Sequence, residues 1–263
     1  MADSVGDVVL VTGASGGIGA KLAAEFAAGG HDLFLVARSA ENLARTAAAI
    51  RSLHDVNVDL LALDLTDPGA CDVLEAEVHR LGVHVEILVN NAGFGLAGRA
   101  ARLDRHDQLE MIDLNIRANV DLILRFLPAM LLRKSGGILN VGSIAGFQPG
   151  PYMAGYYASK AFVGSFTAAL ATECQSAGVQ ITNLAPGPVR TGFADRAGMK
   201  RSGLFRKFKG HEAEAVAKAG YRGFKAGRRL IIPGFGNRAA IIAGRLVPAR
   251  LRDAAIARVI GRR

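Results

Sequence analysis

Apolar and polar residues follow two alternating patterns along the chain up to about residue 190. Short apolar runs predict buried β-strands at residues 7–12, 31–37, 57–65, 86–90, 137–143 and 179–187. Stretches between them predict helices ending near residue 28 and lying at 41–53, 70–81, 104–133 and 154–177. Strands that alternate with helices at this spacing form βαβ units. The pattern therefore predicts an α/β, doubly wound fold with a parallel sheet covered by helices on both faces.

The pattern changes after residue 192. Residues 192–209 mix aromatic, small and cationic side chains without periodicity, and we expect them to form a mobile lid over a substrate. Beyond them the sequence predicts a helix at 211–226, a seventh strand at 228–234, and helices at 237–247 and 249–261.

A length of 263 residues fits one large α/β domain. We expect a single Rossmann-type domain over residues 1–263. Within it, residues up to about 192 would form the cofactor-binding and catalytic core, residues 193–227 the substrate lid, and residues 228–263 the last strand and two basic helices.

Charge is distributed unevenly along the chain, whose net charge is +9. Residues 1–195 hold 14 Lys and Arg against 20 Asp and Glu, whereas residues 196–263 hold 18 against 3. Three interpretations of the basic segment 196–263 remain open: a solvated surface, a peripheral membrane surface, and a site for an anionic ligand such as an acyl-CoA. The last predicted helix carries Leu251, Ala255 and Val259 along one stripe, which suits a membrane interface. No nucleic-acid recognition motif is present, so we expect no nucleic-acid partner.

Composition argues against several other classes of protein. Cys71 and Cys174 are the only cysteines and lie far apart, so we expect no disulfide and a reducing compartment. No secretory signal begins the chain, and Gly and Pro interrupt the uncharged run 135–159. We therefore expect a cytoplasmic protein, and the alternative is a cytoplasmic protein that also associates with a membrane surface. None of the six His residues forms a pair with metal-ligand spacing, so no metal site is predicted.

A glycine-rich turn follows the first predicted strand. Gly13, Gly17 and Gly19 stand between that strand and a helix. Glycines there let the backbone approach a pyrophosphate, which the helix N-terminus then holds. The alternative is a tight turn that binds no ligand.

Residues 143–160 carry the candidate proton-transfer chemistry. Tyr156 and Lys160 lie one helical turn apart, and an ammonium beside a phenol lowers the phenol pKa towards working pH. Such a Tyr gives or takes a proton at neutral pH. Tyr157 also faces Lys160, at i+3, and spacing alone barely separates the two tyrosines. Tyr152 is interpreted as a substrate-side or structural residue.

Several motifs in order along the chain resemble those of the short-chain dehydrogenase/reductase family. They extend over nearly the whole chain to about residue 192. The matching residues are Gly13, Gly17 and Gly19; Asn90, Asn91, Ala92 and Gly93; Asn115; Ser143, Tyr156 and Lys160; and Pro186, Gly187 and Thr191. The late stretch KAGRRLIIPG looks most like a bacterial subgroup that also resembles ketosteroid and 3-ketoacyl reductases.

The resemblance implies hydride transfer at a nicotinamide coupled to proton transfer at the substrate oxygen. The family pattern Y-x-A-S-K selects Tyr156 as the acid in reduction and the base in oxidation. Lys160, with the positive nicotinamide of the oxidised cofactor, would lower its pKa and hydrogen-bond the nicotinamide ribose. Ser143 would polarise the carbonyl oxygen, and Asn115 would hold a water linking Lys160 to solvent.

The expected cofactor site combines the glycine turn, the ends of the following strands and the stretch after the sixth strand. In it, Thr191 and the backbone after Pro186 would fix the carboxamide. Its residues are Gly13, Ser15, Gly16, Gly17, Ile18, Gly19, Arg38, Ser39, Asp64, Leu65, Asn91, Ala92, Gly93, Tyr156, Lys160, Pro186, Gly187, Val189 and Thr191.

The end of the second strand indicates the choice of cofactor. NAD-binding sites of this type place an acid there, on the ribose 2′-hydroxyl, whereas this chain has Ala37, Arg38 and Ser39. Arg38 is suited to a 2′-phosphate and to adenine stacking, and Ser15 or Ser39 would add a hydrogen bond. The sequence therefore predicts NADP(H), with a solvated surface Arg as the alternative. Asp64 is expected on the adenine side or as a helix cap.

The leading hypothesis is an NADP(H)-dependent oxidoreductase that interconverts a carbonyl and an alcohol on a hydrophobic ketone, steroid or acyl substrate. The alternative is a catalytically idle dinucleotide sensor or membrane scaffold on the same fold, because function depends on the site rather than on the fold. The resemblance also implies a homo-oligomer, a dimer or tetramer, paired through the fourth and fifth helices.

Overall fold

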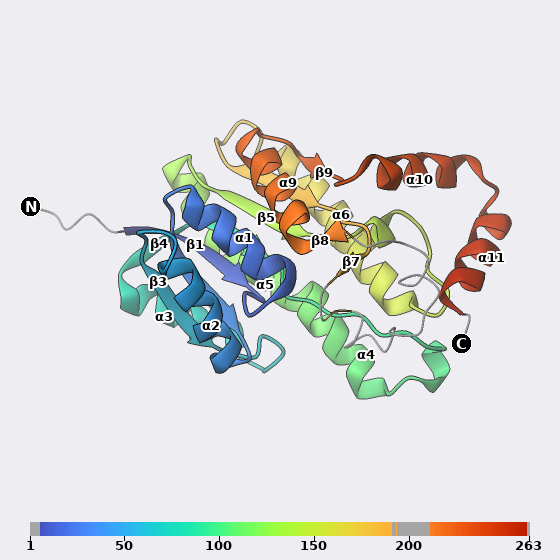
Figure 1. Cartoon of the computed structure of the whole chain (residues 1–263), viewed down its shortest axis with the longest axis horizontal. Coiled ribbons are helices and arrows are strands. Elements are labelled where there is room, and N and C mark those ends of the chain that lie inside the picture. The colour runs from blue at the N-terminus through green and yellow to red at the C-terminus, as the bar shows by residue number, and fades with distance from the viewer. Residues whose placement is uncertain (1–5, 191–192, 194–210, 262–263) are drawn as a thin grey trace, which may run out of the picture.

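A seven-stranded parallel sheet forms the centre of the structure, a computed structural model that describes residues 6–190, 193 and 211–261. The strand order is β3-β2-β1-β4-β5-β6-β9, and every neighbouring pair is parallel. Figure 1 shows the sheet with helices around it. The strands are Gly6–Thr12 (β1), Asp32–Ala37 (β2), Val58–Ala62 (β3), Val83–Asn90 (β4), Gly137–Val141 (β5), Gln180–Leu184 (β6) and Leu230–Ile231 (β9). The chain reverses its direction of travel across the sheet between β1 and β4, which confirms the doubly wound Rossmann fold. Ligands of such sheets bind at the carboxyl ends beside this switch point.

Helices cover both faces of the sheet because successive strand residues point to opposite sides. In β1, Val9 and Val11 face one apolar core, and Val8 and Leu10 face the other. The first core is closed by Gly17–Ala28 (α1), Ala40–Arg51 (α2) and Ala213–Lys225 (α9). The second is closed by Ala70–Leu81 (α3), Asn119–Arg133 (α5) and Ala154–Glu173 (α6).

The stretch 104–133 differs from the single helix that its periodicity predicts. It consists of Arg105–Ile112 (α4), a π-helical segment Asp113–Ala118 and α5. Such π segments insert a wider turn into a helix and occur frequently at functional sites. Asn115, one of the predicted site residues, lies in this wider turn.

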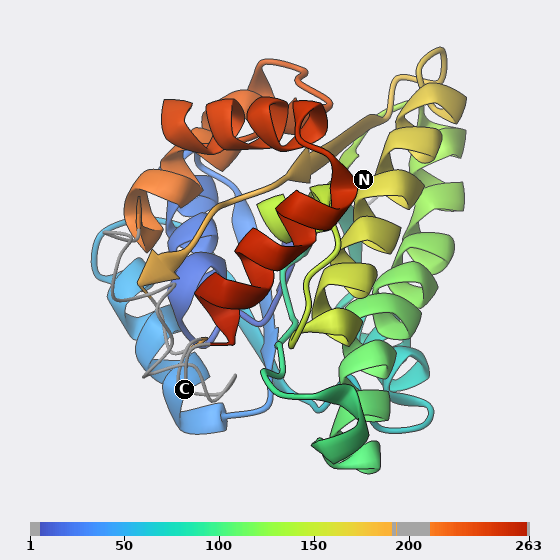
Figure 2. The same cartoon turned by 90° about the vertical axis from the view of Figure 1, so that its right-hand side faces the viewer.

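The carboxyl-terminal third also departs from the predicted boundaries. The strand predicted at 228–234 is paired over only two residues, Leu230 and Ile231, which lie beside Asn183 and Leu184 of β6. Val189–Arg190 (β7) and His211–Glu212 (β8) form a separate parallel pair. The two predicted final helices are present as Phe235–Leu246 (α10) and Ala249–Ile260 (α11). Figure 2 views the molecule from this end, with α10 and α11 in red nearest the viewer.

The segment expected to be a lid is only partly within the described ranges, because residues 194–210 fall outside them. The following helix, α9, packs on α1: the ring of Tyr221 makes an edge contact with Phe26 at 5.1 Å between centroids. A Cβ on Gly220 would lie 2.7 Å from Cδ2 of Leu184. This part of the segment thus covers the sheet. Among the described helices, none is both long enough and apolar enough to span a membrane.

Candidate active site

The glycine turn between β1 and α1 leaves open space at the helix N-terminus. Gly13 and Gly17 have left-handed backbone, with φ of 64° and 56°. A Cβ on Gly19 would lie 2.4 Å from both the Asn91 amide nitrogen and the Gly13 carbonyl oxygen, so packing excludes a side chain there. Beside Gly16, in contrast, no described atom lies within 4 Å of a Cβ position. A pyrophosphate fits this open side of the turn, where the α1 N–H groups are unpaired.

Asn91 and Thr12 join this turn to the end of β4. The Asn91 side chain donates to the carbonyl oxygens of Thr12, at 2.9 Å, and Gly13, at 3.2 Å. The Thr12 hydroxyl accepts hydrogen bonds from the backbone N–H groups of Asn91 and Ala92, both at 3.0 Å. These bonds place the predicted Asn91–Gly93 segment directly against the glycine turn.

Asn115 and Lys160 meet at Gly93. A Cβ on Gly93 would lie 2.8 Å from the Asn115 side-chain oxygen and 3.6 Å from Nζ of Lys160. The Asn115 amide donates to the carbonyl oxygen of Phe94 at 2.9 Å and to the Ser159 hydroxyl at 3.0 Å, and its oxygen accepts from the Phe94 N–H at 3.1 Å. Lys160 is buried and donates to the Val141 carbonyl oxygen at 2.8 Å. The sequence-predicted Asn115 and Lys160 are thus brought together.

Ser143 and Tyr156 are also brought together. Ser143 follows β5 and begins the short 3₁₀ helix Ile144–Phe147, where its hydroxyl accepts from the Ala145 N–H at 3.1 Å. Tyr156 lies in the first turn of α6, and its hydroxyl is hydrogen-bonded to Ser143. The buried Tyr157 instead packs against Gly150, where a Cβ would lie 2.2 Å from its ring. The contact with Ser143 therefore favours Tyr156 over Tyr157 as the proton donor. The assignment of this role to Tyr156 stays a prediction.

Burial shifts the pKa values of both groups. It raises the pKa of Tyr156 to about 12, although the hydrogen bond with Ser143 acts in the opposite direction. Burial lowers the pKa of Lys160 to about 8. The expected lowering of the Tyr156 pKa by Lys160 is not found in this structure, where burial is the largest influence and the hydrogen bond with Ser143 is the one that lowers the pKa. At neutral pH Tyr156 carries its proton and is in the form that donates.

Arg38 at the predicted adenosine end is paired with two acids. Its Nη1 lies 3.2 Å from Oδ2 of Asp64 and 3.7 Å from Oε1 of Glu110 in α4. Its side chain is 47% exposed, so a solvated surface Arg with two ion pairs remains the alternative to a cofactor contact. No sequence pattern marked Glu110, because its contact with Arg38 arises only when α4 folds against the end of β2.

Two neighbours of Arg38 have local structural contacts. The Asp64 carboxylate accepts from the Thr66 N–H and hydroxyl, at 3.0 and 2.7 Å. Burial raises the Asp64 pKa, but the hydrogen bonds from Thr66 and Arg38 outweigh it and hold that pKa below its ordinary value. The helix-capping alternative for Asp64 is wrong, because Gly69 occupies the N-cap of α3. The Ser39 hydroxyl caps α2 by accepting from the Asn42 N–H at 3.3 Å.

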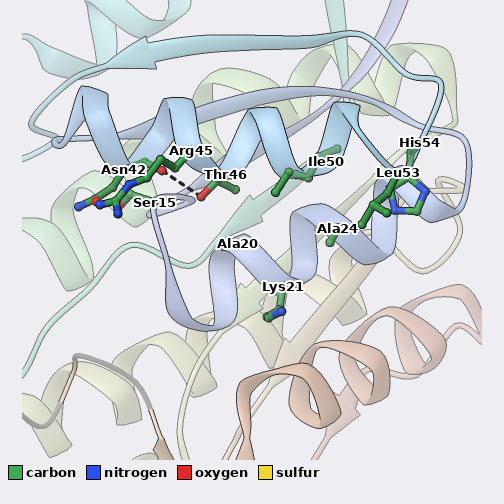
Figure 3. Close-up of a pocket in the computed structure, with 11 residues that line it drawn as sticks. Ser15, Ala20, Lys21, Ala24, Asn42, Arg45, Thr46, Ile50, Leu53 and His54 are labelled. Carbon is green, nitrogen blue, oxygen red and sulfur yellow. Dashed lines mark hydrogen bonds between the residues drawn. The ribbon is translucent and has the colours of Figure 1, made fainter.

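An open groove of about 490 Å³ lies between α1 and α2 (Figure 3). Ser15 of the glycine turn and Asn42 and Arg45 of α2 line its polar end. None of the predicted catalytic residues lines it. It therefore borders the adenosine end and is separate from the proton-transfer site.

The stretch after β6 lies beside Ser143. The Pro186 carbonyl oxygen accepts from the Ile144 N–H at 2.9 Å and from the Ser143 hydroxyl at 3.5 Å. A Cβ on Gly187 would lie 2.5 Å from the side-chain oxygen of Asn237 in α10, a contact that the sequence did not reveal. Val189 is buried in β7, and the predicted contact Thr191 lies outside the described residues.

The other predicted cofactor contacts flank these groups. Ile18 lies in the first turn of α1 and is partly buried, and Leu65, after β3, is buried.

An apolar cluster adjoins Tyr156. Its buried members are Ala145, Met153, Tyr157 and Ile260, and its partly buried members are Ala97, Tyr152, Tyr156, Phe193 and Ile256. Ile256 and Ile260 belong to α11. Sequence reasoning missed them because it grouped Leu251, Ala255 and Val259 on one stripe, and two of these, Leu251 and Ala255, are exposed.

Residues 7–202 match the family model of the short chain dehydrogenases. This match covers well over half of the chain, and the chain therefore belongs to the short chain dehydrogenase family. Sulfoacetaldehyde reductase 2 of Chromohalobacter salexigens is 39% identical over 71% of this chain and 74% of its own length. The fatty acyl-CoA reductase of Acinetobacter baylyi is 38% identical over 71% of this chain and 63% of its own length.

Solved structures of the family superimpose on most of the chain. A short-chain dehydrogenase from Sphingobium yanoikuyae in complex with NADPH has a TM-score of 0.81 and 32% identity, and covers 92% of this chain and 94% of its own. A short chain dehydrogenase/reductase from Burkholderia phymatum in complex with NAD has a TM-score of 0.82 and 25% identity, and covers 94% and 95%. The chain is thus similar to family members that bind either nicotinamide dinucleotide.

Replacing Tyr156 tests the assignment of the proton donor. Tyr156→Phe should lower turnover by at least about 100-fold, because it removes a general acid, while the Kd for NADPH stays within about twofold. Steady-state kinetics and NADPH fluorescence titration measure the two quantities. Tyr157→Phe is the matched control and should stay substantially active. The assignment passes to Tyr157 if the two variants behave the other way round.

Proposed function

We propose that this member of the family is an NADP(H)-dependent oxidoreductase that interconverts a carbonyl and an alcohol on a hydrophobic substrate. The observation that carries the proposal is the convergence of Ser143, Tyr156, Lys160 and Asn115 at the carboxyl ends of β4 and β5, beside the open glycine turn. This arrangement supports the oxidoreductase over the idle alternative, because function depends on the site rather than on the fold.

Tyr156 and Ser143 would transfer the proton and stabilise the negative charge on the substrate oxygen. NADPH bound at the glycine turn would supply the hydride for the carbonyl carbon. Tyr156 donates its proton to the carbonyl oxygen, and the Ser143 hydroxyl, bonded to Tyr156, stabilises the charge that develops there. In the oxidative direction Tyr156 must first lose its proton. Its pKa of about 12 disfavours that step unless a nearby positive charge lowers it.

Lys160 and Asn115 fix the position of the proton donor. Lys160 has a pKa of about 8, so it is largely protonated at neutral pH and provides a positive charge one turn from Tyr156. Asn115 holds the Ser159 hydroxyl, which in turn donates to the Tyr156 carbonyl oxygen at 2.8 Å. We propose that Asn115 positions the first turn of α6 as well as the water that the family resemblance implies.

The reaction itself is tested by following NADPH consumption with ketones, steroids and 3-ketoacyl thioesters. We expect turnover with at least one apolar ketone or thioester, and its loss in Tyr156→Phe. Absence of turnover with every compound, together with tight NADPH binding, would favour the catalytically idle sensor.

Arg38 supports the choice of NADP(H), because it directly follows β2 and no acid occupies the end of that strand. Its pairing with Asp64 and Glu110 weakens its attraction for a 2′-phosphate, since the phosphate must compete with two carboxylates. Ser15 lies in the glycine turn and lines the groove between α1 and α2.

Arg38→Asp should therefore raise the Kd for NADPH by about 10-fold or more, the equivalent of about 1.4 kcal/mol, and leave the Kd for NADH nearly unchanged. Fluorescence titration of both cofactors measures this. Arg80→Asp, which reverses an exposed charge on α3 outside this groove, is the control. Equal affinity of the unaltered protein for NADPH and NADH would refute the preference.

The exposed surface of α10 and α11 supports a peripheral contact with an anionic membrane. Phe235, Ile242, Leu246 and Leu251 are all more than 60% exposed on these helices. Arg238, Arg250 and Arg258 lie on the same two helices, against one acid, Asp253. Apolar side chains bordered by arginines suit a membrane interface, where each cation contributes about 1 kcal/mol near anionic lipid.

Vesicle sedimentation tests this contact. The protein should bind vesicles rich in phosphatidylglycerol, should not bind neutral vesicles, and should bind at least about fivefold more weakly after Leu246→Gln with Leu251→Gln. Val73→Gln, at an exposed apolar residue of α3, is the control. Equal binding to both kinds of vesicle, or to neither, would reject the membrane contact. Binding of acyl-CoA alone would favour the anionic-ligand interpretation.

Exposed apolar residues on α5 and α6 support the proposal of a homo-oligomer. Leu124 and Leu132 of α5 and Phe162 of α6 are exposed, and Phe162 stacks on Phe166 of the same helix. The two helices correspond to the fourth and fifth helices through which the family resemblance implies pairing. We propose that a second copy covers this surface.

A further inference from the structure

We propose that the carboxyl-terminal helix α11 forms a wall of the substrate site, and that Ile256 and Ile260 set the size of the substrate that reaches Tyr156. The proposal rests on the proposed function, because it concerns the same site. It adds two specificity-determining residues from the end of the chain that is farthest in sequence from the glycine turn.

The two isoleucines are the residues through which α11 contacts the rest of the site. Ile260 is only 5% exposed and shares its cluster with Ala145, Met153 and Tyr157. Ile256, one turn earlier, packs on the same cluster and is partly buried. Residues i and i+4 lie on the same face of a helix, so the pair forms one continuous apolar surface towards α6.

The end of α11 is seated on Tyr152. A Cβ on Gly261 would lie 2.6 Å from Cε2 of the Tyr152 ring, so the helix end and the ring are in close contact. Tyr152 has a left-handed backbone with φ of 65°, which is strained for a residue with a side chain. Its carbonyl oxygen accepts from the Gly98 N–H at 2.8 Å, and the Arg99 guanidinium lies 5.8 Å from its ring centroid. Tyr152 thus joins the loop after β4, the start of α6 and α11.

Gly95 and Phe193 also lie against the Tyr156 ring. The rings of Phe193 and Tyr156 are 5.2 Å apart. A Cβ on Gly95 would lie 2.8 Å from Phe193 and 3.1 Å from the Tyr156 ring. The loop after β4 and Phe193 therefore lie in close contact with the Tyr156 ring. The two isoleucines of α11 differ, because the size of their side chains can be changed without altering the backbone.

The side-chain volume on α11 then decides how much room a substrate has beside Tyr156. Shortening either isoleucine to alanine opens space for several carbon atoms, which a bulkier ketone fills and a small ketone leaves empty. One methylene in an apolar pocket changes discrimination by about 10-fold or more. Enlarging Ile260 should act in the opposite direction.

The test compares kcat/KM for a series of methyl ketones of increasing chain length and for aryl ketones of increasing width, with NADPH as the reductant. Ile256→Ala and Ile260→Ala should raise the ratio of kcat/KM for the bulkiest ketone to that for the smallest by at least about fivefold. Ile260→Phe should lower this ratio. The Kd for NADPH should stay within about twofold in every variant, because the change lies on the substrate side.

Ala254→Val is the matched control, since Ala254 lies on the same helix and is exposed. It should keep the unaltered substrate profile. Ile260→Val removes one methyl group and gives a smaller shift in the same direction, which keeps the test available if Ile260→Ala does not fold. The proposal would be overturned if the alanine and valine variants show the same dependence of kcat/KM on ketone size as the unaltered protein.

A measurement of ketone binding tests this proposal independently of the proposed oxidoreductase activity. Ketone binding to the NADPH complex of the Tyr156→Phe variant is measured by quenching of NADPH fluorescence, with and without Ile260→Ala. A shift of binding preference towards bulkier ketones supports α11 as the wall even if the unaltered protein turns none of them over, an outcome that would count against the oxidoreductase alone. No shift in binding preference would reject the wall.

Discussion

The arrangement of the active site depends on the hydrogen bonds of one buried amide, Asn115. Its side chain exchanges two hydrogen bonds with the backbone of Phe94 and donates a third to Ser159. The loop after β4 and the first turn of α6 are thereby both hydrogen-bonded to the same side chain. Buried amide groups that lose such partners cost about 1–3 kcal/mol each. The same bonds that satisfy Asn115 therefore fix the distance between Gly93, where a cofactor is expected, and Tyr156.

Much of the fold was predictable from the sequence because buried parallel strands and their covering helices have distinct periods. The central strands β1, β2, β4 and β5 carry apolar residues on both faces, and the glycines, Asn91 and Ser143 follow strand ends in the expected order. The π segment around Asn115 was not predictable, because its apolar residues continue the pattern of an ordinary helix. Glu110, Asn237 and Ile260 were also missed. Each acquires its role only through a contact between elements that are distant in sequence.

The electrostatics of the site are governed by burial more than by neighbouring charge. Tyr156 and Lys160 lie on the same helix face, yet burial raises the pKa of one and lowers that of the other. Both shifts bring the pair towards its neutral form. The arrangement therefore suits a site that gives up a proton to a substrate, whereas the reverse direction needs additional positive charge near the phenol. At the adenosine end neighbouring charge matters more than burial, because Arg38 is half exposed and forms ion pairs with two carboxylates.

The apolar cluster beside Tyr156 joins segments that leave the ribosome at very different times. Ala97 and Ala145 come from the first part of the chain, whereas Ile256 and Ile260 come from the last described helix. Domains generally fold as units, so this cluster is complete only after α11 has been synthesised. The residues of the glycine turn are made early, but the surface beside Tyr156 depends on the last described helix. Loss of α11 would therefore remove part of this surface while every residue of the glycine turn is retained.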